Sequence, residues 1–383
     1  MENPLLPDRV VTALRCVPAP VSAYVYDREL LLDRVRLVRS SLPPGASLLY
    51  AVKANGHPDL LAAVAPSVDG FEVASGGELA LALAAGARSI MFAGPAKTDD
   101  ELCAAVRAGA TVNVESEFEL RRLSLLAIDA GASAEVGLRI NRPVPITADV
   151  THRMTGEPTQ FGISEADLPA LVDLASCLPG VRLRGLHLHA MSNNLAADAH
   201  VAFVTDALDW ALATGLNLDY LNVGGGFGID YLRSRSFDVS LLKSIVVPAG
   251  LRLIFEPGRF LVAPAGWYAA EVVDLKRSHG RWFAVVRGGT HHFRLPAAWG
   301  YSHPFSVLPV DDWPYPFTRP VIADVEIDVA GELCTPRDIL ARGAWTDRLR
   351  IGDLLVFADT GAYGWEISHH DFLAHPYPVM IVL

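Results

Sequence analysis

Short apolar runs rich in β-branched residues alternate with amphipathic helical patterns over the first two thirds of the chain. Apolar runs bounded by turn residues are typical of buried strands, and apolar positions three and four residues apart indicate helices. The runs lie at residues 47–52, 70–74, 89–93, 111–114, 134–140, 182–189, 218–223 and 251–255. Helical patterns lie at 28–42, 59–65, 77–85, 99–108, 117–130, 165–176, 197–213 and 239–247. Eight strands that alternate with helices predict an α/β fold, a (β/α)8 TIM barrel. A doubly wound open sheet is the competing arrangement, but the even recurrence of the units favours the closed barrel.

The pattern changes after about residue 262. Helical spacing becomes rare, and β-rich runs lie at 267–275, 282–287, 321–329 and 354–358, separated by Pro and Gly. The extended segment 21–26 can add a strand to the same region. We therefore expect residues 1–26 to join the β domain, 27–262 to form the barrel, and 263–383 to form a C-terminal antiparallel β domain.

Composition narrows the class of protein. The chain has 383 residues, of which 51% are hydrophobic, and its net charge of −11 argues against nucleic acid or an anionic membrane as the main partner. No apolar run reaches the roughly 20 residues that a membrane span needs. The four cysteines are widely spaced and form no CxxC pair, so they predict neither a disulfide framework nor a metal site. We expect a cytoplasmic protein without a metal.

The ends of the predicted strands carry the candidate chemistry, since the active site of a barrel gathers there. Lys53 follows the first strand, and a lysine there is costly to bury unless it has a partner or a covalent bond. It is either a side chain that reaches out to solvent or a lysine that forms a Schiff base. His187 and His189 alternate on the sixth strand and face the same side. They are either hydrogen-bonded core residues or flat rings available to stack on an aromatic ligand.

The last two predicted strands end in motifs that suit an anion. Three successive glycines, Gly224, Gly225 and Gly226, follow the seventh strand, and Gly258-Arg259 follows the eighth. Barrels commonly bind phosphate at these two strand ends, where glycines let backbone N–H groups turn toward an anion. A tight structural turn is the alternative. Glu256, also at the end of the eighth strand, is either a surface carboxylate or the partner of a protonated pyridine nitrogen.

Taken together, these motifs resemble the fold-type III pyridoxal-phosphate decarboxylases, the diaminopimelate, ornithine and arginine decarboxylase family with alanine-racemase-like architecture. The matching segments are YAVKAN, FEVASGGEL, THRMTGEPTQFG, HLHAMS, GGGF, EPGR, CTPRD and GAY, in this order along nearly the whole chain. The resemblance implies Lys53 as the Schiff-base lysine, His189 stacked on the cofactor ring and Glu256 on the pyridine nitrogen. It implies a phosphate site of Ser192, Gly224, Gly225, Gly226, Gly258, Arg259 and Tyr363.

Cys334 lies beyond the barrel, in the segment GELCTPRD. A free cysteine is often a small buried apolar residue. The family reading instead makes Cys334 the acid that returns a proton to the α-carbon after CO2 leaves, contributed across the interface of a homodimer. Racemases of this architecture use a tyrosine from the same region, so Cys334 favours decarboxylation.

The departures from the family pattern concern the substrate. Diaminopimelate decarboxylases carry an acidic residue directly after the cysteine, where this chain has Thr335. Met191 replaces a usual glycine, and Gln160 a usual lysine. Basic candidates for the distal end of a substrate are Arg287, His291, His292, Arg294 and Arg337, which suit carboxylates. For His291, His292 and Arg294, a solvated loop is the alternative.

The segment EISHHDFLAHP near residue 370 resembles decarboxylases of carboxylate-siderophore pathways, which act on citryl-diaminopropionate. That substrate is our expectation. Diaminopimelate decarboxylation, amino-acid racemisation and a non-catalytic relative that binds pyridoxal phosphate remain the alternatives.

Overall fold

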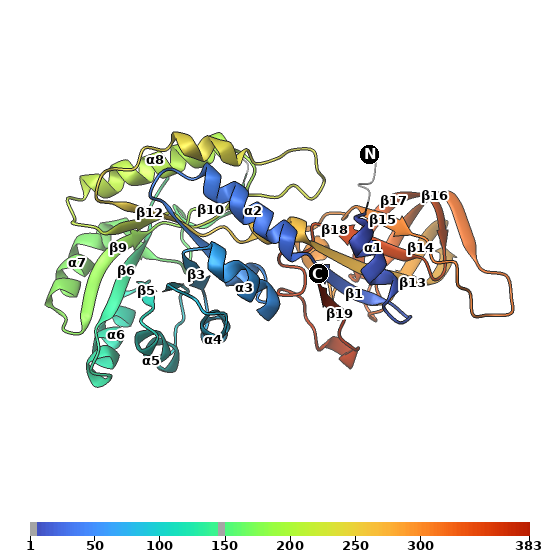
Figure 1. Cartoon of the computed structure of the whole chain (residues 1–383), viewed down its shortest axis with the longest axis horizontal. Coiled ribbons are helices and arrows are strands. Elements are labelled where there is room, and N and C mark those ends of the chain that lie inside the picture. The colour runs from blue at the N-terminus through green and yellow to red at the C-terminus, as the bar shows by residue number, and fades with distance from the viewer. Residues whose placement is uncertain (1–5, 145–149) are drawn as a thin grey trace. The chain divides into compact units, whose positions relative to one another are not determined.

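The structure, a computed structural model, describes residues 6–144 and 150–383. Two compact units divide the chain. The barrel unit comprises residues 32–230 and 234–261, and the β unit comprises the described part of residues 1–31 together with 231–233 and 262–383 (Figure 1).

Eight parallel strands close the barrel in the order β5-β4-β3-β2-β12-β11-β9-β6, with β5 paired to β6. The strands are β2 (Ser47–Ala51), β3 (Gly70–Val73), β4 (Ile90–Phe92), β5 (Thr111–Val114), β6 (Ala134–Asn141), β9 (Val181–His187), β11 (Tyr220–Asn222) and β12 (Arg252–Phe255). A short strand, β8 (Ile163–Ser164), pairs in parallel with the end of β6, and β7 (Val150–Arg153) pairs with β10 (Met191–Asn194). The predicted barrel is therefore confirmed, and the open sheet is excluded by the β5–β6 pairing.

Helices alternate with the barrel strands, and α2 precedes the first of them. They are α2 (Arg28–Ser41), η1 (Val52–Ala54), α3 (Pro58–Val64), η2 (Ala65–Ser67), α4 (Gly76–Ala84), α5 (Asp99–Arg107), α6 (Glu117–Asp129), η3 (Glu165–Asp167), α7 (Leu168–Cys177), α8 (Ala197–Ala213), η4 (Val239–Ser244) and α9 (Arg259–Val262). Side-chain oxygens start several of them: Ser75 accepts from Glu78 N, and Thr98 forms a capping box with Glu101. The helix expected at 239–247 is a shorter 3-10 helix.

The β unit is a mixed sheet of eight strands. Its elements are α1 (Asp8–Arg15), β1 (Ser22–Tyr26), η5 (Ala263–Ala265), β13 (Gly266–Ser278), β14 (Arg281–Val286), α10 (Leu295–Trp299), β15 (Phe305–Leu308), β16 (Val321–Ala330), β17 (Ile339–Arg350), β18 (Leu354–Ala358), η6 (Phe372–Ala374) and β19 (Val379–Val382). The sheet order is β15-β18-β13-β14-β16-β17, and β1 pairs with both β13 and β19.

The expected antiparallel β domain is a mixed sheet: most of its neighbouring strands are antiparallel, but β14 pairs with β16 and β1 with β19 in parallel. Parallel neighbours need a long connection, and the segment between β14 and β16, which contains α10 and β15, supplies one. The apolar core of this unit includes Val10 and Leu14 of α1, Val25 of β1, Trp267 of β13 and Val356 of β18.

The described residues contain neither a candidate membrane span nor a candidate metal site. Across residues 6–144 and 150–383, no helix is long and apolar enough to cross a membrane. In the same ranges, no group of three or more His, Cys, Asp or Glu side chains is placed to hold a metal ion.

Candidate functional site

Lys53 lies just beyond the end of β2, on η1. Its Nζ donates to both carboxylate oxygens of Glu72, at 3.0 Å and 2.9 Å. Glu72 lies on β3, opposite Ala51, and its side chain is 2% exposed, whereas that of Lys53 is 39% exposed. The ion pair offsets the cost of burying the carboxylate and holds the amine at the barrel mouth, within reach of a ligand.

Glu256 follows β12 and is buried. Asn222, at the end of β11, donates to Glu256 Oε1 at 2.5 Å, and His187 Nε2 lies 3.6 Å from Oε2. Burial raises the pKa of Glu256 to about 8, and the negative charge of Glu72 acts in the same direction. Such a carboxyl is largely neutral at pH 7 and ionises readily when a cation is placed opposite it.

The glycine turn after β11 has no room for side chains. A Cβ at Gly225 would lie closer than 3.0 Å to the backbone carbonyl oxygen of Glu256, and one at Gly226 would lie 2.5 Å from Met191 O. Gly226 also has a φ of +95°, which side chains disfavour. Asn222 Oδ1 accepts from Gly224 N at 2.9 Å and fixes the start of the turn. The result is a tight loop of backbone amides of the kind that binds anions.

The two histidines at the end of β9 are neutral: His187 is the last residue of the strand, and His189 lies two residues beyond it rather than on the strand as expected. Burial lowers the pKa of His187 well below its usual range, helped by the positive charge of Arg139; burial and Lys53 do the same for His189. His189 Nδ1 accepts from Gly225 N at 3.3 Å, so its ring is joined to the glycine turn. A neutral ring held in this way offers a flat, uncharged face.

The remaining predicted barrel residues lie near the same strand ends. Ser192 is on β10, whose strand partner is β7, and Arg259 is a buried residue that begins α9. Gly258 fits against Ala54, where a Cβ would lie 2.6 Å from the Ala54 Cβ. This contact brings the turn after β12 against the segment that carries Lys53.

The structure contains a buried network of ion pairs at the barrel mouth that we did not predict from the sequence. Arg139, on β6, pairs with Glu115 at 2.9 Å, and Glu115 also accepts from the backbone N–H groups of Gly94 and Gly162. Lys97 pairs with Glu119 at 2.6 Å and donates to Gly94 O and Asn113 O. Together they fix the loops after β4, β5 and β6. We also did not predict Glu72 from the sequence. Its strand neighbours the strand that precedes Lys53, and this position could have identified it as a partner of the lysine.

In the β unit, Cys334 is exposed on a loop that two carboxylates fix. Asp338 is buried and accepts from Leu333 N at 2.8 Å and from Thr290 N at 2.6 Å. Glu332 accepts from Gly288 N at 3.0 Å and forms an ion pair with Arg287. These contacts hold the Cys334 loop against the segment after β14 and leave the thiol accessible.

The predicted basic residues fall into two groups. Arg287 is paired with Glu332, and His291 and His292 are fully buried. His292 shares hydrogen bonds with Ser22 Oγ at 2.9 Å and Pro376 O at 3.1 Å, and His291 Nε2 lies 3.5 Å from Glu332 Oε1. Arg294 and Arg337 are exposed.

Tyr363 lies in the β unit with a φ of +55°. A non-glycine residue with positive φ is uncommon and is concentrated at functional sites.

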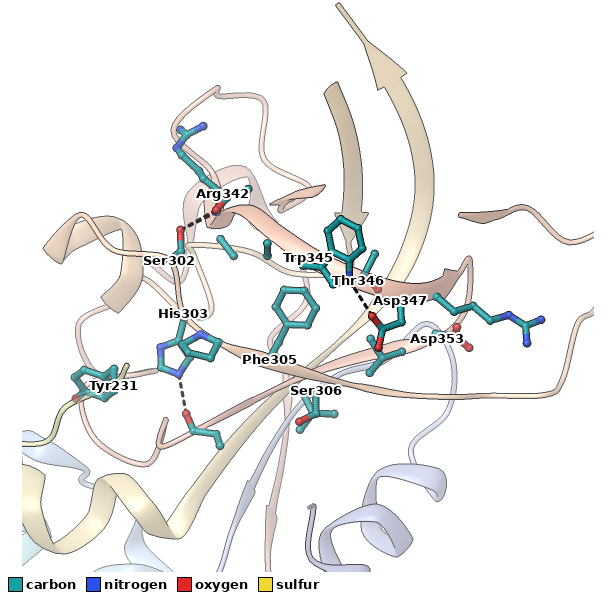
Figure 2. A pocket seen from close by; sticks show the side chains of 18 of the residues that line it. Tyr231, Ser302, His303, Phe305, Ser306, Arg342, Trp345, Thr346, Asp347 and Asp353 are labelled. Atoms are coloured by element: carbon teal, nitrogen blue, oxygen red, sulfur yellow. Dashed lines mark hydrogen bonds between the residues drawn. The ribbon is translucent and has the colours of Figure 1, made fainter. Parts of the chain in front are cut away.

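A separate cavity of about 1120 Å³ lies within the β unit (Figure 2). It is walled by β15, β17 and β18 and by Tyr231, Leu232 and Arg233. Its charges are largely paired with one another: Arg233 with Asp359 at 2.6 Å, and Arg350 with Asp353 at 2.9 Å. Because none of the predicted site residues is among those that line it, we assign it no chemistry.

The chain is similar in sequence to known decarboxylases. Residues 28–263 match the family described as "Pyridoxal-dependent decarboxylase, pyridoxal binding domain". The chain is 40% identical to 2-[(L-alanin-3-ylcarbamoyl)methyl]-2-hydroxybutanedioate decarboxylase of Staphylococcus aureus, over 98% of this chain and 97% of the relative. It is 34% identical to diaminopimelate decarboxylase of Deinococcus radiodurans, over 94% of this chain and 89% of the relative.

The same fold is found in a solved structure. Diaminopimelate decarboxylase from Helicobacter pylori, complexed with L-lysine, superposes with a TM-score of 0.86 at 23% identity, covering 97% of this chain and 93% of that one.

Proposed function

The chain belongs to the pyridoxal-dependent decarboxylases, and on that basis we propose that it removes the α-carboxylate of an L-amino acid whose distal end carries citrate-derived carboxylates. The observation that carries the proposal is the full-length similarity to the staphylococcal enzyme, whose name describes an alanine unit joined by an amide to a hydroxybutanedioate. The substrate would be citryl-diaminopropionate, in siderophore biosynthesis. Diaminopimelate decarboxylation is the second candidate, and its relatives are less similar.

The residues of the barrel mouth fit pyridoxal phosphate, the cofactor of this family. The cofactor supplies an electron sink for the carbanion left when CO2 departs. We assign Lys53 as its covalent anchor, and Glu72 holds the amine in place beforehand. Glu256 would face the ring nitrogen. Its carboxyl is largely neutral in the absence of a neighbouring cation, and a protonated ring nitrogen would supply that cation. His189 would cover one face of the ring.

The phosphate would bind where the backbone amides gather. We assign it to the turn that no side chain fits, together with the barrel residues that the resemblance implied; these are Ser192, Gly224, Gly225, Gly226, Gly258 and Arg259. For Tyr363 of the β unit, the resemblance alone carries the prediction. Asn222 ties this turn to Glu256, so the two ends of the cofactor are positioned by one side chain.

Cys334 would return a proton from Sγ to the α-carbon. Its exposure and its position on a loop fixed by Asp338 support this role. We propose a cytoplasmic homodimer in which Cys334 of one protomer serves the site of the other. The four free thiols are consistent with a reducing compartment.

The distal end of the substrate would meet the cations of the β unit. Thr335 cannot pair with a distal ammonium group as a carboxylate would, which disfavours diaminopimelate. Arg294 and Arg337 are exposed and available for direct contact with carboxylates, whereas Arg287, His291 and His292 would support that surface from within.

A CO2-release assay over a matched set of substrates tests the proposal. The enzyme loaded with pyridoxal phosphate is incubated with citryl-diaminopropionate, diaminopimelate, ornithine, lysine and arginine at equal concentrations. We expect turnover of the citryl conjugate at least a hundredfold above the others, since a site built for paired groups rejects ligands that leave its cations unpaired. Efficient turnover of diaminopimelate with none of the citryl conjugate would overturn it. Exchange of the α-hydrogen without CO2 release would indicate a racemase.

A further inference from the structure

The basic side chains around the Cys334 loop differ in how many of their nitrogen atoms already have a partner. Arg287 is paired with Glu332, and His292 uses both ring nitrogens inside the β unit. Within residues 6–144 and 150–383, by contrast, neither the guanidinium of Arg294 nor the ring of His369 has a hydrogen-bond or ion-pair partner. Their donors are therefore available to a ligand.

The fold places His369 beside Arg294. Ser368 Oγ accepts from Arg294 N at 3.1 Å and donates to Gly364 O at 2.7 Å, so the segment before His369 is fixed to the start of α10. Ser368 N donates to Trp365 O at 3.0 Å, and Phe372 N to His369 O at 3.1 Å. The His369 ring is half-buried on a loop held at both ends.

Asp338 connects the Cys334 loop to the segment before Arg294 and acts on His369. Asp338, which accepts from Leu333 N next to Cys334, also accepts from Thr290 N, four residues before Arg294. The negative charge of Asp338 acts on the His369 ring as well. Asp338 thus fixes the loop of the proposed proton donor to the segment before Arg294, and its charge also acts on His369, all within the β unit.

We propose that His369 and Arg294 together form a subsite for a distal carboxylate of the substrate, and that His369 helps to determine specificity for it. This inference rests on the proposed function, since it assigns a residue to the far end of that substrate. A guanidinium and an imidazole N–H would donate to the same carboxylate, and hydrogen bonds with a charged partner are the stronger ones.

The electrostatic surroundings suit this role. Burial lowers the pKa of His369, and the positive charges of Arg294, His291 and His370 act in the same direction, while Asp338 opposes them. The ring is therefore neutral at pH 7 and does not repel Arg294. A carboxylate placed between the two raises the pKa of the ring, so binding takes up a proton and weakens as pH rises.

The test compares H369Q, H369N and R294Q with two control substitutions, R348Q on β17 and H279N in the turn after β13. The controls remove an exposed arginine and an exposed histidine of the same unit. Michaelis constants are measured with the cofactor-loaded enzyme for citryl-diaminopropionate and for acetyl-diaminopropionate, which lacks distal carboxylates. Calorimetry measures binding of citrate alone to the same proteins.

We expect each of the three variants to raise KM for the citryl substrate about tenfold, the equivalent of one charge-assisted hydrogen bond, with kcat nearly unchanged. KM for the acetyl substrate should stay constant, and citrate binding should weaken by a similar factor. Unchanged KM and unchanged citrate binding in both His369 variants would overturn the inference while leaving the proposed function intact. If the unaltered enzyme does not decarboxylate the citryl substrate but binds citrate through His369, the proposed function is wrong and the subsite stands.

Discussion

Replacement of Glu256 by Gln should stabilise the cofactor-free chain and at the same time impair the enzyme. The fold raises the pKa of Glu256 from 4.5 to about 8, mainly by burial. In the unfolded chain this carboxyl ionises above about 4.5, whereas in the folded chain it stays protonated until about pH 8. The folded state therefore loses stability as pH rises from 4.5 to 8, and the loss is constant above that.

The size of the effect follows from the shift. One pKa unit corresponds to about 1.4 kcal/mol, so the cost at pH 8.5 is on the order of a few kcal/mol, a large share of the stability of a typical domain. Gln cannot ionise, and its Oε1 can still accept the hydrogen bond from Asn222. Glu256→Gln should thus add a few kcal/mol of unfolding free energy at pH 8.5 and much less at pH 5.

Chemical denaturation of the cofactor-free protein at the two pH values measures this difference. Glu115→Gln is the matched control of opposite sign, because Glu115 pairs with the buried Arg139 and its neutralisation leaves that cation uncompensated. With pyridoxal phosphate bound, Glu256→Gln should slow decarboxylation. A Glu256→Gln protein that is less stable than the unaltered chain at pH 8.5, or equally stabilised at both pH values, would refute the reasoning.

Three further substitutions test other parts of the site. Gly225→Ala should weaken cofactor binding about ten- to a hundredfold, because its Cβ displaces the backbone of the phosphate turn; Gly77→Ala, where the nearest atom is 3.8 Å away, should not, and equal losses in an absorbance titration would contradict this. Lys53→Ala should abolish the borohydride-fixed cofactor mass, and persistence of that mass on another residue would disprove the assignment. Cys334→Ala should retain cofactor binding and slow product formation, which a CO2 and product balance measures. Mixed Lys53→Ala and Cys334→Ala chains should regain part of the activity if sites are shared, and two folded variants that never complement each other would exclude sharing.

Hydrophobic patterning was sufficient to predict the barrel. Its strands are short apolar runs buried on both faces, so the sequence signal is continuous and survives without tertiary information. The β unit was harder. The strand β17 alternates small, charged and aromatic residues, and its pairing with β16 contains register shifts, so no clean period marks it. Strand direction depends on which distant segments meet, and for this reason the parallel pairings escaped prediction.

In the candidate site, too, some features could be predicted from the sequence and others could not. Residues at strand ends, such as Lys53 and Glu256, could be predicted because barrel topology brings those ends together. Their partners could not be chosen, since Glu72, Asn222 and Arg139 become recognisable only when strand register decides which side chains face each other. The burial of His291 and His292 likewise reflects long-range packing that local polarity conceals.

The pairing of β1 with β19 has a consequence for synthesis on the ribosome. Residues 22–26 emerge early, yet their strand partners are residues 266–270 and 379–382, and Leu383 N donates to Tyr26 O. At about 5 to 20 residues per second, β1 waits roughly 20 to 70 seconds for its last neighbour. During that interval its unpaired edge is open to other chains. The barrel can complete its ring of strands before then, so nascent chains stalled after residue 262 should hold a formed barrel and an apolar N-terminal strand that chaperones would need to shield.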